Sequence, residues 1–210
     1  KPKHEGISLV LVDMNQPGVR IRPIALLNGE SPFCETFFEN AVANKDDLIG
    51  PVNGGWAVGK RLLQHERSVH GGVNTAGAQV QADNASLAEI AHQYGTLNDP
   101  TFRQRLTEFE THDRAYQLTR QRVMAETEAS APTVATSILK VTGSVLAQER
   151  IEIQQAAMGA AGAGWEAPGF SDLELSTTRE WLHSRAVTIY GGTREIQKNI
   201  IAKRVLGLPD

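Results

Sequence analysis

The spacing of apolar residues changes along the chain and divides it into two parts. In the first part, apolar residues alternate with polar ones or form short runs at residues 7–12, 19–22 and 33–42. The turn-forming pairs Pro17-Gly18 and Asn28-Gly29 separate these runs. This pattern is typical of β-strands joined by turns. Because three strands are too few to close a barrel, we expect part of a larger β-domain.

From Gly54 onward the apolar residues recur at helical spacing. Asp99-Pro100 should begin a long helix, since Asp caps helices and Pro fits the first turn. Gly95 should end the preceding helix. The predicted helices cover residues 54–70, 76–94, 99–128, about 132–153, 172–184 and 193–206. Long helices joined by short Gly or Pro breaks are typical of an antiparallel four-helix bundle.

The sequence therefore predicts a mainly α protein with a small β part. We expect residues 1–52 to form part of a β-domain and residues 53–210 to form a four-helix bundle. The two parts should be separate structural units with a boundary near Asn53.

Composition excludes several classes of protein. The 210 residues carry a formal net charge of -3 without a basic patch, which argues against a nucleic-acid partner. No apolar run approaches the roughly 20 residues that span a bilayer, and residues 1–12 lack the pattern of a signal peptide.

The lone Cys34 favours a reducing compartment and should be a core residue of its strand. The six histidines are scattered, so we expect no metal site.

Glu66 is the first candidate for chemistry. It follows Val58 and Leu62 at four-residue steps, which places it beside an apolar helix face. Burial would raise the pKa of its carboxyl group toward that of a general base. The alternative is a salt bridge, for example to Arg61. The adjacent Arg67 is either a solvated charge or a clamp for an anionic group.

Two glycine-rich segments are further candidates. Gly191-Gly192 would let a ligand approach the backbone ahead of a helix that Thr193 caps. The alternative is a glycine hinge. Residues 158–165 could cradle a phosphate, but no strand precedes them as in a dinucleotide fingerprint. A tight turn between packed helices is the other interpretation.

The order of several segments resembles the acyl-CoA dehydrogenase family. In chain order, these segments are Gly6–Asp13, Pro17–Val19, Glu35–Asn40, Gly54–Trp56, Glu66-Arg67 and Tyr190–Pro209. The last one looks like the C-terminal signature of the family. The resemblance covers essentially the whole chain and is weakest between residues 95 and 165.

The resemblance implies a partial protein. Members of this family have a helical domain, a β-domain and a C-terminal four-helix bundle, and total nearly twice this length. The missing β-strands supply much of the flavin site, so we expect the isolated fragment to be inactive.

The reaction that the resemblance implies is α,β-desaturation of an acyl-CoA thioester, with FAD accepting a hydride. Many members place the catalytic base directly after the signature Tyr, where this chain has Gly191. Some place it before an Arg on the first bundle helix, which Glu66-Arg67 matches.

The resemblance also assigns the remaining site roles. The Gly191 N–H would polarise the thioester carbonyl, Arg67 would lie near CoA, and Tyr190 and Gly192 would line the acyl pocket. Thr193 and Glu195 would meet FAD. Two flavin-binding elements of the family are not recognisable: an Arg-x-x-Phe-Gly run expected near residues 98–102, and Gln-x-x-Gly-Gly, replaced by residues 156–160.

The implied partners are acyl-CoA, an electron-transfer flavoprotein and further copies of the chain, as a homodimer or homotetramer. The implied location is the bacterial cytoplasm or the mitochondrial matrix. Two other functions fit the resemblance. One is a non-catalytic subunit of a heteromeric dehydrogenase, and the other is a flavin oxidase or monooxygenase of the same fold.

Overall fold

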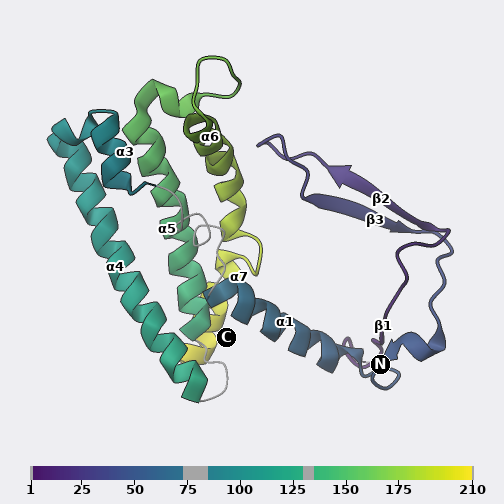
Figure 1. The fold of residues 1–210 in the computed structure, drawn as a ribbon. Coiled ribbons are helices and arrows are strands. Elements are labelled where there is room, and N and C mark those ends of the chain that lie inside the picture. Colours follow the sequence, from purple (N-terminus) through teal and green to yellow (C-terminus); the bar gives the residue numbers. More distant parts are fainter. Residues whose placement is uncertain (1, 73–84, 130–134, 210) are drawn as a thin grey trace. The chain divides into compact units, whose positions relative to one another are not determined.

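The computed structural model describes residues 2–72, 85–129 and 135–209, with backbone alone at 64–72, 126–129 and 135–136. The chain divides into two compact units, Lys1–Glu66 and Arg67–Asp210. Strands occupy the purple and blue segment in Figure 1, and most helices occupy the teal to yellow segment. Each unit is described by itself.

Unit 1 holds two small antiparallel sheets. Strands β2 (Val19–Ile24) and β3 (Phe33–Phe38) form a hairpin, and β1 (Leu9–Val10) pairs with β4 (Leu48–Ile49). The prediction of a third strand as far as residue 42 was wrong. The strand ends at Phe38 because Asn40 takes a positive φ of 58°, which interrupts extended backbone.

The described residues of unit 1 bury no apolar side chain. Phe33 and Phe38 are exposed on β3, and so is Cys34, which was wrongly predicted to lie in a core. A two-stranded hairpin cannot cover its own faces, so an apolar strand residue stays exposed unless another layer packs on it. The bare hairpin is consistent with a partial β-domain.

Helix α1 (Gly55–Gly72) begins close to the first strand. The Gly55 N–H donates to the Ile7 carbonyl at 2.8 Å. A Cβ atom at Gly55 would lie 2.5 Å from the backbone N of Leu9, so this contact requires glycine. Glycine therefore fixes where α1 leaves the small sheet.

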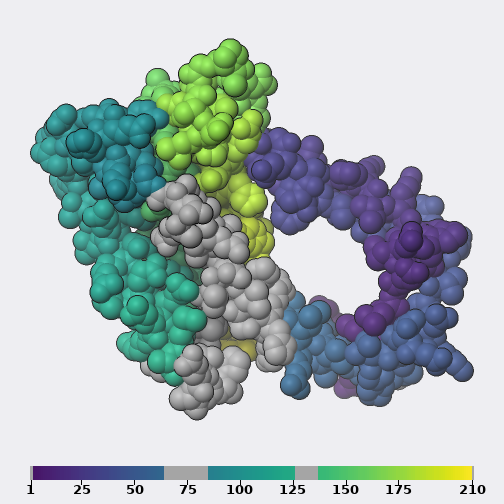
Figure 2. All heavy atoms as spheres, in the orientation of Figure 1, coloured from purple at the N-terminus to yellow at the C-terminus, as the bar shows by residue number. Residues whose placement is uncertain are grey.

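Unit 2 is a helical bundle built around α5. Successive helices α4 (Pro100–Ala129), α5 (Ala135–Met158) and α6 (Asp172–Ser184) run antiparallel, and α3 (Leu87–Gln93) packs against α5 (Figure 1). Figure 2 shows α3 against the first part of α4 at one end of the bundle. This arrangement confirms the predicted fold class. The core cluster consists of Leu87, Ile90, Ala91, Phe102, Leu106, Phe109, Leu146, Ile153, Ala157 and Met158.

Local signals set the helix ends. Asp99 Oδ1 accepts from the Thr101 N–H at 2.8 Å, and α4 begins at Pro100, as predicted. Gly95 takes a left-handed φ of 77° after α3, which confirms it as the stop signal. Ser86 with Glu89 caps α3, and Ser171 with Glu174 caps α6, in reciprocal capping boxes.

The end of the chain returns to the bundle after α6. A 3-10 turn at Arg185–Thr188 leads to the short helix α7 (Arg194–Ile200), which packs on α5 and continues into a π-helical turn at Ile201–Val205. Among the described helices, none is long and apolar enough to cross a membrane.

Candidate functional site

The signature turn, residues 190–193, lies between the 3-10 turn at Arg185–Thr188 and α7. The N–H groups of Ile189 and Tyr190 both donate to the Ala186 carbonyl, at 2.9 and 3.1 Å. These two bonds close the 3-10 turn and direct the chain into the signature turn.

Both glycines of the signature turn have positive φ angles, 66° at Gly191 and 96° at Gly192. L-residues avoid this region because of their Cβ atom. A Cβ at Gly192 would also lie 2.4 Å from Gln197 Nε2, whereas one at Gly191 would lie 3.7 Å from Lys140 Cε. Conformation therefore favours glycine at both positions, and a side chain at Gly192 would also have to displace the Gln197 amide.

The N–H and C=O groups of the signature turn differ in their hydrogen bonding. Neither Gly191 nor Gly192 donates its N–H to an acceptor within the described residues. The Gly191 carbonyl is occupied, because Gln197 Nε2 donates to it at 3.3 Å. Gln197 itself is buried, with 3% of its surface exposed. The turn thus offers N–H groups to a ligand oxygen while its carbonyl is held by the protein.

Lys140 of α5 lies beneath the signature turn. Its ammonium donates to the Val187 carbonyl and lies 4.9 Å from the centroid of the Tyr190 ring. Lys140 is buried, and burial lowers the pKa of its ammonium group. Burial likewise raises the pKa of the Tyr190 phenol.

Thr193 and Glu195 begin α7. Thr193 Oγ1 accepts from the Ile196 N–H at 3.4 Å, which confirms the predicted N-cap. The pKa of the Glu195 carboxyl group is lowered, first by a hydrogen bond to its own backbone N–H and then by the Thr193 side chain. Glu195 is exposed, so its ionised carboxylate is accessible at the start of the helix.

Glu66 and Arg67 lie in the second half of α1, as the helical spacing predicted. Their side chains are outside the described part of the chain, and the division of the sequence into two units falls between these two residues. The roles of base and clamp therefore stay predictions.

The glycine-rich segment after α5 is a tight turn. Residues Gly159–Ala163 form a 3-10 helix between α5 and α6. The Gly162 carbonyl accepts from Gln155 Nε2 at 2.9 Å and from Thr178 Oγ1 at 3.0 Å. Gly162 is buried, and a Cβ there would lie 2.6 Å from the Gln155 carbonyl oxygen. These contacts support the tight-turn interpretation.

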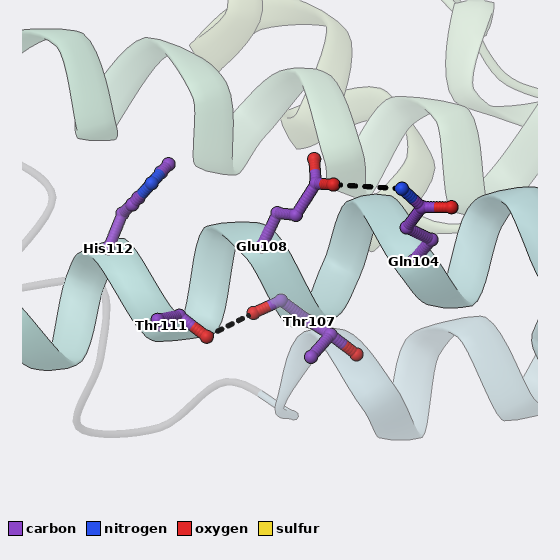
Figure 3. Close-up of a pocket in the computed structure, with 5 residues that line it drawn as sticks. All are labelled: Gln104, Thr107, Glu108, Thr111 and His112. Atoms are coloured by element: carbon purple, nitrogen blue, oxygen red, sulfur yellow. Dashed lines mark hydrogen bonds between the residues drawn. The ribbon is translucent and has the colours of Figure 1, made fainter.

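A shallow hollow of about 320 Å³ lies along α4, away from the signature turn (Figure 3). Its described lining residues are Gln104, Thr107, Glu108, Thr111 and His112. Gln104 Nε2 donates to Glu108 Oε1 at 3.0 Å, so two of these polar groups already bind each other. Among the described residues, no group of three or more His, Cys, Asp or Glu side chains could hold a metal ion.

Lys140 and Gln197 were not predicted as part of the site. Lys140 stands in the run Ile138-Leu139-Lys140-Val141, where a lone cation among apolar residues was the available signal. Gln197 carried no such signal. Lys140 donates to the Val187 carbonyl just before the signature turn, and Gln197 donates to the Gly191 carbonyl within it. Sequence spacing does not reveal such bonds.

Comparison with known proteins identifies the family of this chain. A family model described as "Acyl-CoA dehydrogenase, C-terminal domain" matches residues 53–206. The chain belongs to the acyl-CoA dehydrogenase family.

Two curated relatives match almost the whole chain. Acyl-CoA dehydrogenase IpdE1 of Mycolicibacterium smegmatis is 38% identical over 99% of this chain and 50% of its own length. The Mycobacterium tuberculosis protein of the same name is 35% identical over 99% of this chain and 52% of its own length. The chain thus spans about half the length of these relatives.

Solved structures share the fold. The structure titled "Tcur3481-Tcur3483 steroid ACAD" is 23% identical, with a TM-score of 0.85 over 100% of this chain and 54% of that one. The ChsE4-ChsE5 complex from Mycobacterium tuberculosis is 21% identical, with a TM-score of 0.79 over 100% of this chain and 55% of that one. The fold therefore matches these solved structures along the whole length of this chain.

Proposed function

We propose that the whole protein is an FAD-dependent acyl-CoA dehydrogenase that desaturates the α,β bond of an acyl-CoA thioester. One observation carries this proposal. This chain belongs to the family, and in its signature turn the N–H groups of Gly191 and Gly192 have no acceptor among the described residues. Such donors can stabilise negative charge on a thioester oxygen as the α-proton leaves.

The α-proton requires a base, which Gly191 cannot supply. We assign this role to Glu66, since it lies on the first helix of the matched domain and directly before Arg67. The proton passes to the Glu66 carboxylate, and the hydrogen on the β-carbon leaves as hydride. Arg67 provides a positive charge for the CoA moiety.

Two polar side chains at the start of α7 could form hydrogen bonds with a flavin. Thr193 Oγ1 accepts the capping bond from Ile196, and its O–H donates toward the Glu195 carboxylate, so the two side chains form one polar group at the start of α7. The Glu195 carboxylate is exposed and can accept bonds from N–H or hydroxyl groups. FAD, when bound, supplies the acceptor for the hydride. We assign Thr193 and Glu195 to its binding, with Tyr190 and Gly192 beside the acyl group.

The proposed partners follow from this chemistry. Two electrons leave the substrate as hydride and then pass to an electron-transfer flavoprotein. We also propose a homodimer or homotetramer in the cytoplasm. Since the fold matches a protein titled a steroid ACAD, steroid-type thioesters should be tested beside straight-chain ones.

The test is Glu66→Gln in the full-length protein. Mixing with acyl-CoA without oxygen should bleach the visible flavin absorbance of the wild type. Loss of a general base should slow bleaching by about 10²- to 10⁴-fold while acyl-CoA still binds. Glu110→Gln, an exposed change on α4, is the matched control and should bleach like the wild type. Bleaching at the wild-type rate in Glu66→Gln would remove Glu66 as the base.

A second candidate is a non-catalytic subunit of a heteromeric dehydrogenase. Gly191 stands where many family members carry the base, and two of the structural relatives are titled as pairs of proteins. The purified full-length protein decides between the candidates. A catalytic protein carries FAD and turns over alone, whereas a partner subunit does so only when a second chain is present.

A further inference from the structure

We propose that Lys140 is a positioning residue that holds the signature turn in its active geometry from the α5 side. The inference rests on the proposed function, because it assigns the consequence of this anchoring to thioester activation. The Lys140 ammonium makes two contacts on the same short segment: a hydrogen bond to the Val187 carbonyl and a cation–π contact with the Tyr190 ring at 4.9 Å.

Burying the Lys140 ammonium costs free energy unless other groups of the protein bind it. Only 7% of the residue is exposed, and its described contacts do not include a carboxylate. A buried cation without a counter-ion is unfavourable, and strong bonds to oriented dipoles and to an aromatic face offset part of that cost. The lowered pKa of Lys140 reflects the same burial.

The contacts of Lys140 control the backbone that enters Gly191. Val187 lies in the 3-10 turn whose Ala186 carbonyl accepts from the N–H of Tyr190. The Lys140 stem also lies beside Gly191, since Cε is 3.7 Å from the place of a Cβ there. The ammonium therefore fixes both ends of the segment 187–190 and, through it, the peptide that carries the Gly191 N–H.

Gln197 restrains the same segment from α7. Its Nε2 donates to the Gly191 carbonyl at 3.3 Å. Since a trans peptide points its C=O and N–H in opposite directions, this bond turns the Gly192 N–H away from Gln197. Lys140 and Gln197 thus orient the two successive peptides that present the unused donors. A shift of about 1 Å in such donors can cost about 100-fold in rate.

The test compares Lys140→Met with Gln154→Met in the full-length protein. Lys140→Met keeps the stem and removes the ammonium, which leaves the Val187 carbonyl without this donor. Gln154 lies on the same helix, is buried, and donates to Thr177 Oγ1 at 2.8 Å, so its variant is a matched loss of a buried polar contact. Lys140→Gln, a milder change, is used if Lys140→Met does not fold.

Amide hydrogen exchange measures the local effect of the substitution on the backbone and does not depend on enzyme activity. Exchange of the Ile189 and Tyr190 amides, which donate to the Ala186 carbonyl, should rise about tenfold or more in Lys140→Met, because the lost bond to Val187 involves a charged donor. It should stay near the wild-type rate in Gln154→Met. Unchanged exchange in Lys140→Met, or an equal rise in both variants, would overturn the proposal.

Stopped-flow absorbance measures the effect of the substitution on the rate of flavin reduction. The limiting rate of reduction by acyl-CoA should fall about 10- to 100-fold in Lys140→Met, while the acyl-CoA concentration that gives half of this rate changes little. A wild-type limiting rate in Lys140→Met would also overturn the proposal. If the wild-type protein itself does not reduce its flavin, the proposed function fails, and hydrogen exchange still decides whether Lys140 holds the turn.

Discussion

The Tyr94 phenol donates a hydrogen bond to Glu174 Oε1 at 2.6 Å, and this bond joins the end of α3 to the first turn of α6. The Glu174 carboxylate also accepts from the Ser171 N–H at 2.7 Å in the capping box of α6. One carboxylate therefore serves both a helix cap and a tertiary contact. The bond from Tyr94 and then those from Ser171 lower the pKa of Glu174.

Stability should depend on the charge of Glu174. Its pKa is lower in the folded protein than in the unfolded chain, so its contribution is full above the unfolded pKa and is lost as pH falls through the folded pKa. Tyr94→Phe should lower the urea midpoint at neutral pH, and the difference from wild type should shrink at acidic pH. Tyr116→Phe is the control, because burial is the largest cause of the raised pKa of that phenol. A Tyr94→Phe deficit that is equal at both pH values would contradict the prediction.

Arg185 should matter more for stability than Arg105, although both face Glu152. Arg185 lies 3.0 Å from Glu152 Oε1, donates to the Trp181 carbonyl and to Ser184 Oγ, and covers the Trp181 ring at 4.8 Å. The Arg105 pair is 4.0 Å long, with 45% of that side chain exposed. Arg185→Ala should cost about 1–2 kcal/mol, and Arg105→Ala less than about 0.5 kcal/mol. Urea unfolding measures both, and equal losses would show that only the ion pair with Glu152 counts.

Most helices and several of their ends could be predicted from the sequence, because local chemistry determines them. Asp99-Pro100, Gly95 and Thr193 act on backbone groups within a few residues of themselves. The Ser-x-x-Glu pattern that begins with Ser86 gave the same kind of signal and was overlooked. Capping is a short-range effect, so spacing alone is enough to find it.

Tertiary contacts could not be predicted in this way. The bond from Lys140 to Val187 joins residues 47 positions apart and depends on how α5 packs against the turn after α6. The exposure of Cys34 depends on what packs over the β2–β3 hairpin, which apolar alternation does not report. The signature turn could be predicted as a candidate from its glycines and given its role by family resemblance, whereas its supports became visible only in three dimensions.

The two glycines of the signature turn should differ in their tolerance of a methyl group. Gly191→Ala should cost about 1 kcal/mol, the penalty for an L-residue in the left-handed region, since its Cβ would make an ordinary 3.7 Å contact with Lys140. Gly192→Ala should cost about 1–3 kcal/mol more, because its Cβ would lie 2.4 Å from Gln197 Nε2 and must displace it. Urea unfolding of the full-length variants measures the difference, and Gln197→Ala added to Gly192→Ala should recover part of it. Equal costs for the two single variants would show that Gln197 does not confine Gly192. A larger cost at Gly192 should be accompanied by slower flavin reduction, since displacing Gln197 also frees the Gly191 carbonyl.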